Sequence, residues 1–282
     1  MPNLDSVTLE NLYCLFKGEP GTRKSGCALS FPGKQYWFSF DRKMDGLLIP
    51  MRKWGINPKM VDYDDYMDWT PALKKLEGFR TVNPYKTIII DSITSCADAI
   101  NRQTLRIKSG SGGSEAGKRV AGIPVNSIED FNAEESALKE LVSLTKDIQG
   151  YHGCNIILIA HVIQKDVKNA SGQVTHVSRT IVTAGKGIAA KIPAYCSEVY
   201  HFNIKGGGMT GTGGYSILTK HTGDDFARSS LDIDSEIVFN DEPLYPKWIK
   251  PAIDKTRPEG KTEPTTEPKH ANNPFSASKL GV

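Results

Sequence analysis

Short, almost continuously apolar runs recur along the chain, separated by segments rich in turn residues. They lie at 12–16, 36–40, 87–90, 155–160, 198–202 and 215–219. Strands that are covered on both faces have this pattern, and the longer segments between several of the runs have helical character. The pattern predicts an α/β protein with a largely parallel central β-sheet flanked by helices.

The clearest helix is predicted over about 128–149. Ser127 can cap it together with Asp130 three residues later, and Gly150 is expected to end it. Its apolar stripe consists of Phe131, Leu138, Leu141, Val142 and Ile148. One apolar face of this kind is typical of a helix that packs against a core.

Two internal stretches and one end of the chain depart from the pattern. Residues 108–122 are rich in Gly and Ser, and residues 164–178 are polar and contain Asn-Ala-Ser-Gly, so both are predicted to be mobile loops. From 251 onward, Pro, Thr, Glu and Lys replace apolar residues. We therefore expect one domain over 1–250 and a disordered tail over 251–282, which could bind a protein partner.

Composition narrows the function classes. The 35 Lys and Arg nearly balance the 32 Asp and Glu, so any affinity for nucleic acid must come from local clusters. The five cysteines form no CxxC or CxxH pair, which argues against a zinc site and against a secreted disulfide framework. There is no signal-peptide pattern, and no apolar stretch approaches the ~20 residues of a membrane span. A cytoplasmic location without membrane partners is expected.

A glycine-containing turn follows the first apolar run and precedes a predicted helix. In a phosphate-binding P-loop, backbone N–H groups surround the phosphates, Lys24 neutralises the terminal ones and Ser25 holds Mg²⁺. The candidate nucleotide-binding residues are Gly18, Glu19, Pro20, Gly21, Thr22, Arg23, Lys24, Ser25 and Gly26. Arg23 stands where the motif expects glycine, and its side chain would either crowd the loop or project toward a neighbouring subunit. The alternative is an ordinary Gly-Pro turn with a solvated Lys24.

A second apolar run ends in an acid at Asp91. At the carboxyl end of a strand in an open α/β sheet, this carboxylate can bind Mg²⁺ beside the P-loop. An Asp in this position alone is more often a turn or helix cap. Because it follows the P-loop by about 65 residues, the two motifs together favour a site for ATP and Mg²⁺.

In their order, these motifs resemble the RecA-like ATPases, and more narrowly the small phage-encoded RecA-like proteins associated with single-strand annealing or recombination. The resemblance covers about residues 10–240 and rests on GEPGTRKS, on FSFD ending at Asp41, on IIIDS containing Asp91, and on ILIAH ending at His161. It implies that His161 senses the terminal phosphate and that a DNA-binding loop follows it. The alternative interpretation, from its position alone, is that His161 is a structural histidine at a strand end whose ring nitrogens are hydrogen-bonded within the fold.

The resemblance leaves the catalytic base open. RecA-like enzymes commonly carry a Glu just after the second strand, where this chain has Phe40-Asp41-Arg42-Lys43. Protonated Lys43 cannot act as a base. Hydrolysis is therefore slow, absent, or dependent on Asp41 or another acid. RecA-like assemblies also place a cation of one subunit against the nucleotide of the next, and Lys220 and Arg228 are candidates here, with solvated surface charges as the alternative.

Two segments concentrate positive charge. Candidate DNA-binding residues after His161 are Lys165, Lys168, Arg179 and Lys186, joined by Lys191 and opposed by Asp166. The earlier segment contains Arg102, Arg106, Lys108, Lys118 and Arg119 against Glu115. Such segments can follow a phosphate backbone, although solvated polar loops have the same composition.

Together these features predict an ATP-dependent protein that binds single-stranded DNA, acts in recombination or annealing, and assembles into rings or filaments. The alternatives are a hexameric helicase-like motor and a nucleotide-binding interaction module without turnover, the latter favoured by Arg23 and Lys43.

Overall fold

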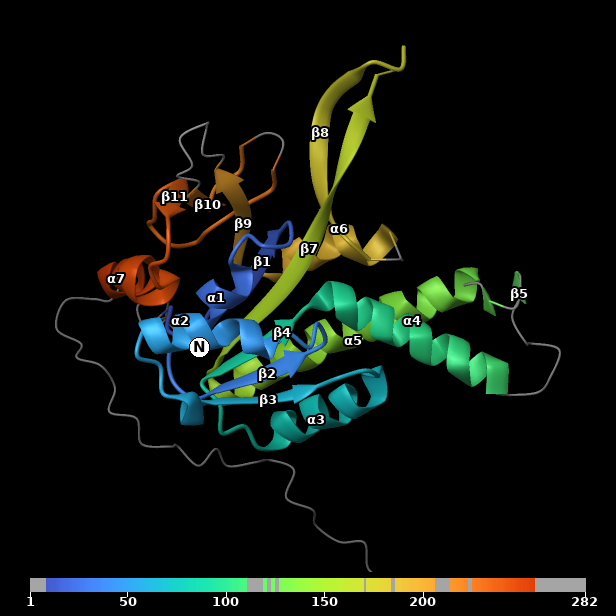
Figure 1. The fold of residues 1–282 in the computed structure, drawn as a ribbon, viewed down its shortest axis with the longest axis horizontal. Coiled ribbons are helices and arrows are strands. Elements are labelled where there is room, and N and C mark those ends of the chain that lie inside the picture. The colour runs from blue at the N-terminus through green and yellow to red at the C-terminus, as the bar shows by residue number, and fades with distance from the viewer. Residues whose placement is uncertain are drawn as a thin grey trace, which may run out of the picture.

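A nine-stranded sheet forms the centre of the protein (Figure 1). The computed structural model describes residues 9–110, 119–120, 123–124, 127–169, 171–183, 186–205, 214–222 and 225–256. The strand order is β11-β10-β9-β1-β7-β4-β2-β3, and β8 pairs with β7. The strands are β1 (Tyr13–Gly18), β2 (Gln35–Ser39), β3 (Val61–Asp65), β4 (Thr87–Asp91), β7 (Asn155–Lys168), β8 (Val174–Ile181), β9 (Glu198–Lys205), β10 (Gly214–Leu218) and β11 (Glu236–Phe239).

The six strands from β9 to β3 in this order are parallel, whereas β8, β10 and β11 run antiparallel to their neighbours. The prediction of an α/β fold with a largely parallel sheet is confirmed. A separate short pair, β5 (Arg119–Val120) and β6 (Ile123–Pro124), lies outside this sheet.

Each central strand contributes to two hydrophobic cores, one on each face of the sheet. In β1, Leu15 packs into the first core and Phe16 into the second; in β7, Leu158 and Ile159 divide in the same way. Because successive side chains of a strand point to opposite faces, a strand that is buried on both faces must be apolar throughout. This is the physical origin of the continuous apolar runs in the sequence.

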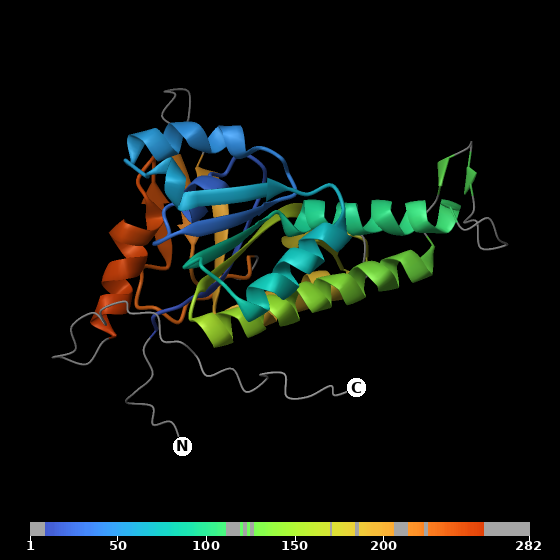
Figure 2. The same cartoon turned by 90° about the horizontal axis from the view of Figure 1, so that it is seen from below.

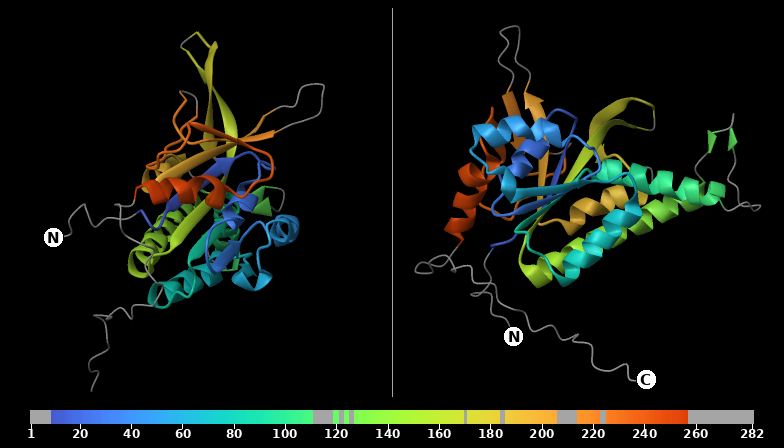
Figure 3. Two further views of the ribbon diagram at one scale, coloured as in Figure 1. Left: turned by 90° about the vertical axis from the view of Figure 1, so that its left-hand side faces the viewer. Right: turned by 60° about the horizontal axis from the view of Figure 1, so that its bottom comes forward.

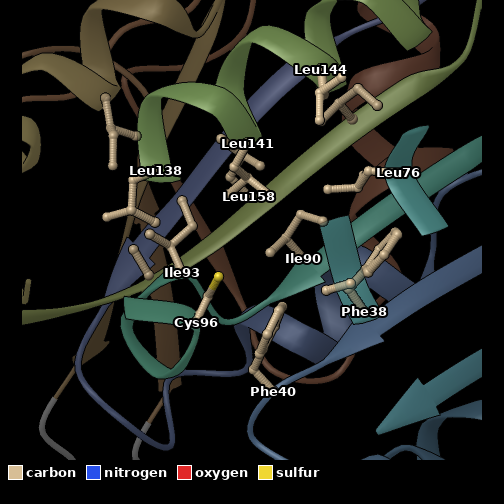
Figure 4. Close-up of a cluster of buried hydrophobic side chains, with 14 of the residues drawn as sticks. Phe38, Phe40, Leu76, Ile90, Ile93, Cys96, Leu138, Leu141, Leu144 and Leu158 are labelled. Carbon is tan, nitrogen blue, oxygen red and sulfur yellow. The ribbon is translucent and has the colours of Figure 1, made fainter. Parts of the chain in front are cut away.

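Helices cover both faces and complete a three-layer arrangement (Figure 3). The first core is covered by α3 (Trp69–Thr81), α4 (Ile93–Gly110), α5 (Ile128–His152) and α6 (Lys186–Tyr195). The second is covered by α1 (Lys24–Leu29), η2 (Met44–Leu47), α2 (Leu48–Lys53), the π-helical turn η4 (Tyr245–Ile249) and α7 (Lys250–Lys255). A short 3₁₀ turn, η3 (Pro58–Met60), precedes β3. Figure 4 shows Leu138, Leu141 and Leu144 of α5 packed over Leu158 and Ile90 in the first core.

The predicted helix at 128–149 is present, with a different end. Ser127 and Asp130 form the predicted capping box. The helix continues through Gly150 to His152 and ends at Gly153, which has φ 58°. A helix ends in this way where a residue adopts the left-handed conformation, and Gly153 does so rather than Gly150.

The two long helices α4 and α5 lie side by side and extend well beyond the sheet (Figure 2). The predicted loop 108–122 therefore begins later than expected, because residues 108–110 still belong to α4. Lys108 is held there by its Nζ–Oδ1 contact of 2.6 Å with Asp130 of α5. The remainder of this loop, apart from β5, lies outside the described residues.

The predicted mobile loop 164–178 is instead largely a β-hairpin. Strand β7 continues through Lys168, and β8 returns antiparallel from Val174 to Ile181. At the turn between them, the Asn169 side chain accepts hydrogen bonds from the backbone N–H groups of Ser171 and Gln173. Scattered β-branched residues, among them Val162, Val167, Val174 and Val177, supply strand propensity within a polar composition.

The predicted tail begins too early. Residues 251–255 belong to α7, where Ala252 and Ile253 are each 3% exposed and pack in the second core. Residues 257–282, the rest of the predicted tail, lie outside the described residues. Within the part of the chain that the structure describes, no helix has both the length and the apolar character needed to cross a lipid bilayer.

Candidate functional site

The topology brings the ends of four parallel strands to one edge of the sheet. Gly18 at the end of β1 is in register with His161 of β7, and Ser39 at the end of β2 is in register with Asp91 of β4. Since β7 lies between β1 and β4, His161 stands between the P-loop and Asp91. In open α/β sheets, ligands bind at this carboxyl edge.

Two glycines of the P-loop are required by its geometry. A Cβ atom on Gly18 would lie 2.4 Å from the carbonyl oxygen of Phe202 in β9, so only glycine permits this close approach. Gly21 has φ 81°, a left-handed conformation that glycine adopts without strain.

Arg23 occupies the position of the motif's last glycine and has φ 68° and ψ 17°. The motif expects glycine because the backbone is left-handed at this point, and a residue with a side chain pays about 1 kcal/mol there. The guanidinium lies 3.8 Å from Asp241 and 5.3 Å from the centre of the Tyr215 ring. The Arg23 side chain therefore projects out of the loop and does not crowd it. The residues that it contacts belong to its own chain.

Lys24 is folded back onto the P-loop. Its Nζ donates to the carbonyl oxygens of Gly18 at 2.9 Å and Glu19 at 2.7 Å, and to Thr22 Oγ1 at 3.2 Å. Burial lowers the pKa of Lys24 to about 8, against the opposing effect of Asp91 and other nearby carboxylates. The ammonium group thus lies in a desolvated loop where phosphate oxygens could replace the carbonyl oxygens as its partners.

Ser25 and Asp91 are in direct contact, because Ser25 Oγ donates to Asp91 Oδ2 at 2.8 Å. Burial, together with the charge of Asp41, raises the pKa of Asp91 to about 6. A hydroxyl and a carboxylate oxygen side by side are hard donors of the kind that Mg²⁺ prefers, and a divalent cation would offset the cost of the buried charge. The residues therefore fit a magnesium ion that also contacts phosphate.

Asp41 lies between two partners. Ser92 Oγ donates to its Oδ1 at 2.8 Å, and His161 Nε2 lies 3.2 Å from its Oδ2. Burial acts to raise the pKa of Asp41, but the hydrogen bonds from His161, Ser95 and Ser92 outweigh it and hold the pKa well below the usual range. Asp41 is therefore a firmly ionised carboxylate, better suited to orienting a water molecule or a histidine than to accepting a proton.

His161 is fixed through its backbone and one ring nitrogen. Its N–H donates to Thr94 Oγ1 at 3.1 Å, and Nε2 faces Asp41. Its Nδ1 is buried and has no hydrogen-bond partner among the described residues. An unsatisfied ring nitrogen in a cavity wall is suited to a polar ligand atom.

These side chains line one cavity of about 370 Å³. Its walls are Pro20 to Gly26 of the P-loop, with Asp41, Lys43, Gly46, Leu47, Pro50, Asp91, Ile159 and His161. The cavity has a charged end and an apolar side, and its volume falls in the usual range for small-molecule sites. A larger and more open hollow of about 670 Å³ lies at the end of β3, lined by Asp64, Asp65 and neighbouring residues, and contains none of the P-loop.

Arg228 is not part of this arrangement. Its backbone pairs with Val199 at the start of β9, whereas the P-loop lies at the opposite end of the parallel strands. Its Nε donates to the carbonyl oxygen of Cys196 at 3.0 Å, and a terminal nitrogen donates to that of Ala194 at 3.3 Å. Arg228 thus closes the amino edge of the sheet. Lys220 is exposed in the segment after β10.

The candidate DNA-binding residues lie on the hairpin and at the start of α6. Lys165 and Lys168 belong to β7, Arg179 to β8, and Lys186 begins α6. Arg179 pairs with the buried Asp225 at 2.6 Å, which partly neutralises it. The side chains of the three lysines lie outside the described residues. In the earlier basic segment, Arg106 is paired with Asp68 and Lys108 with Asp130, so its positive charge is also reduced.

Sequence reasoning missed a buried polar cluster behind the P-loop. Lys17 and His201 are neighbours in register on β1 and β9, and Asp225 and Arg179 lie beside them. Burial lowers the pKa of Lys17 to about 8, and burial and the charge of Lys17 lower that of His201 to about 4. The one available signal was a lysine inside an otherwise apolar run, immediately before Gly18.

The P-loop also contacts the hairpin, since Gln164 Nε2 of β7 donates to Glu19 Oε1 at 3.1 Å. This contact joins the phosphate loop to the strand that carries His161.

Comparison with known proteins identifies the family. The sequence profile of the family described as AAA domain matches residues 10–231. Among solved structures, a KaiC-like protein, PH0186, from the hyperthermophilic archaeon Pyrococcus horikoshii OT3 is similar at 14% identity, with a TM-score of 0.46, over 85% of this chain and 96% of that one. No curated protein matches the chain in sequence. The profile covers the P-loop, both acidic strand ends and His161, so the chain belongs to the AAA-domain family and carries a nucleotide-binding P-loop domain.

Proposed function

We propose that the protein binds ATP with Mg²⁺ at this cavity and uses the bound nucleotide to control binding of single-stranded DNA, acting in recombination or strand annealing of the phage type. The observation that carries the proposal is the continuity of β7. One strand passes His161 in the cavity wall and then forms the first half of the projecting hairpin (Figure 1).

The roles at the cavity follow from the contacts. Lys24 would exchange its loop carbonyl partners for phosphate oxygens, and Ser25 with Asp91 would hold Mg²⁺, which neutralises phosphate charge when bound. Asp41 would orient the attacking water or His161, and the buried, unpaired Nδ1 of His161 would become a partner of the terminal phosphate. Because Asp41 binds a proton weakly, we expect slow hydrolysis.

The hairpin supports a nucleic-acid partner through its charge and its place. It contains Lys165, Lys168 and Arg179 against Asp166, and it projects from the same edge of the sheet as the cavity. A two-stranded ribbon of this kind can follow a phosphate backbone without reading bases. The contact between Gln164 and Glu19 would let the occupancy of the P-loop affect the hairpin.

Fluorescence anisotropy with a labelled oligothymidine tests the DNA proposal, with and without ATP, over a series of salt concentrations. A Lys165→Gln, Lys168→Gln variant should bind more weakly and lower the slope of log K against log salt by about 1.4, because each single-strand phosphate contact contributes about 0.7. This variant retains the pair between Arg179 and Asp225.

A matched control neutralises the exposed Lys59 and Lys74, which lie on η3 and α3. It should bind DNA as the parent does. Parent protein that binds no DNA in either nucleotide state would refute this part of the proposal.

One observation favours an alternative, a nucleotide-binding interaction module without turnover. The only carboxylates in the described wall of the cavity are Asp41 and Asp91, and both are engaged in hydrogen bonds. Phosphate release from ATP, measured with and without single-stranded DNA, separates the two: DNA-stimulated release supports the recombination protein, and none in either condition supports the module. Light scattering with ATP and DNA would test for the proposed ring or filament.

A further inference from the structure

The described wall of the cavity contains three cationic side chains, and they differ in their partners. Arg23 is directed to Asp241 and Tyr215. Lys24 is bonded to the carbonyl oxygens of its own loop. Lys43 is exposed and lines the cavity, and its side chain has no hydrogen bond or ion pair with any other described residue. Its ammonium group is therefore available to a ligand.

The two cavity carboxylates form no ion pair with Lys43, and they accept hydrogen bonds from other residues. Both oxygens of Asp41 have partners in Ser92 and His161, and Asp91 accepts the hydroxyl of Ser25. The Lys43 side chain lines the same cavity as these acids but forms no ion pair with either of them. The positive charge of Lys43 would attract an incoming anion. The anion could bind this ammonium group without first breaking an ion pair.

The backbone around Lys43 is held on both sides. The N–H groups of Phe40 and Asp41 both donate to the carbonyl oxygen of Asp91, at 2.7 and 3.1 Å. On the other side, the Lys43 carbonyl accepts from Gly46 N at 3.1 Å as η2 begins. Between these anchors Arg42 has φ 53°, a left-handed conformation that costs a residue with a side chain about 1 kcal/mol. Strain of this kind persists where the surrounding structure fixes the backbone, and here it turns the chain so that Lys43 lines the cavity.

Lys43 also approaches the cavity from the side opposite to Lys24. The P-loop follows β1, whereas Lys43 follows β2, and β7 and β4 lie between those strands. A phosphate chain anchored on the P-loop would meet Asp91 first and reach Lys43 only if it extends further. The group that Lys43 can contact is therefore the last phosphate of the chain.

We propose that Lys43 is a phosphate-binding residue contributed by the protein's own chain, and that it distinguishes nucleoside triphosphates from diphosphates. The inference rests on the proposed nucleotide site and adds to it a binding role for the position after β2. Lys43 would hold the terminal phosphate, which favours retention of the triphosphate over its cleavage.

Isothermal titration calorimetry of the full chain with Mg²⁺-ATP and Mg²⁺-ADP tests the proposal. Lys43→Met keeps the length of the side chain and removes its charge. We expect its Kd for ATP to rise about tenfold, equivalent to 1.4 kcal/mol, and its Kd for ADP to change less than twofold. Lys43→Arg should restore most of the discrimination because it retains a cation.

Lys59→Met is the matched control, since Lys59 is exposed on η3 and does not line the cavity. It should leave both constants unchanged. Equal losses for ATP and ADP in Lys43→Met, or no loss for either, would overturn the role of Lys43. A parent protein that binds neither nucleotide would instead refute the proposed function itself, so the two failures are distinguishable.

Discussion

Replacing the cavity acid Asp91 should stabilise the nucleotide-free protein while removing a ligand of the proposed magnesium site. Burial and the charge of Asp41 raise the pKa of Asp91 from 3.8 to about 6. Each pKa unit corresponds to 1.36 kcal/mol of difference between the protonation states, so the ionised carboxylate costs the fold about 3 kcal/mol. Because part of Asp91 reaches the cavity, we expect Asp91→Asn to gain about 2 to 3 kcal/mol of unfolding free energy at pH 7.5.

The sign of the pH dependence follows from the raised pKa. Well below pH 3.8 the carboxyl is protonated in both the folded and the unfolded chain, and its contribution vanishes. Between pH 4 and 6 the unfolded chain ionises first, so the parent loses stability as the pH rises, and the full penalty is present above pH 6. The advantage of Asp91→Asn should therefore grow from about 0.5 kcal/mol at pH 4 to its maximum at pH 7.5.

Urea denaturation followed by circular dichroism, at several pH values with EDTA and without nucleotide, measures this difference. Asp232→Asn is the control, because Asp232 is exposed and does not line the cavity. The reasoning is refuted if Asp91→Asn is no more stable than the parent at pH 7.5, or if its advantage does not change with pH. Calorimetry should show in addition that Asp91→Asn loses more affinity for Mg²⁺-ATP than for ATP in EDTA.

Three further predictions test single features. Lys24→Ala should abolish ATP binding in calorimetry while leaving the circular dichroism spectrum unchanged, because it removes the loop ammonium; unchanged affinity would contradict the P-loop assignment. In urea denaturation, Arg23→Gly should have a free energy of unfolding about 1 kcal/mol higher than that of Arg23→Ala. Both variants lose the side-chain contacts of Arg23, but only glycine relieves the strain of the left-handed φ of 68°. A chain ending at Thr256 should melt like the parent, whereas one ending at Lys250 should melt lower because it loses two buried residues of α7; equal melting temperatures would show that α7 does not contribute to the core.

The fold could be predicted because burial on both faces leaves a clear record in the sequence. The segment 156–160 of β7 has no polar position, and few structures other than a strand buried on both faces require this. The positions of the P-loop and Asp91 could also be predicted from the sequence. A turn whose backbone approaches another strand as closely as Gly18 approaches Phe202 can contain few residue types at that point. The capping box of α5 is similarly local, since Ser127 and Asp130 are three residues apart.

What escaped prediction depends on long-range partners. The hairpin appeared to be a loop because its strands pair only with each other and therefore need no apolar face. The tail boundary was misplaced because Ala252 and Ile253 are buried in the second core, most of whose members are remote in sequence. The role of Arg228 toward a neighbouring subunit stays a prediction, whereas its place at the amino edge of its own sheet is known only from the register with β9.

Arg23 was identified as a departure from the motif, but the direction of its side chain depends on Asp241 and Tyr215, more than 190 residues away.

The continuity of β7 also has a mechanical consequence. The strand runs without interruption from the sheet interior to Lys168, seven residues beyond His161, which at about 3.3 Å per residue is an overhang of about 23 Å. Inside the sheet β7 pairs with a strand on each side, β1 and β4, whereas beyond His161 its only paired strand is β8. The hairpin is thus an arm that is fixed at one end, next to the cavity, and projects from the sheet. A tilt of about 5° at the fixed end would move the turn of the hairpin by about 2 Å. Displacements that are too small to disturb the packed core therefore become appreciable at the turn.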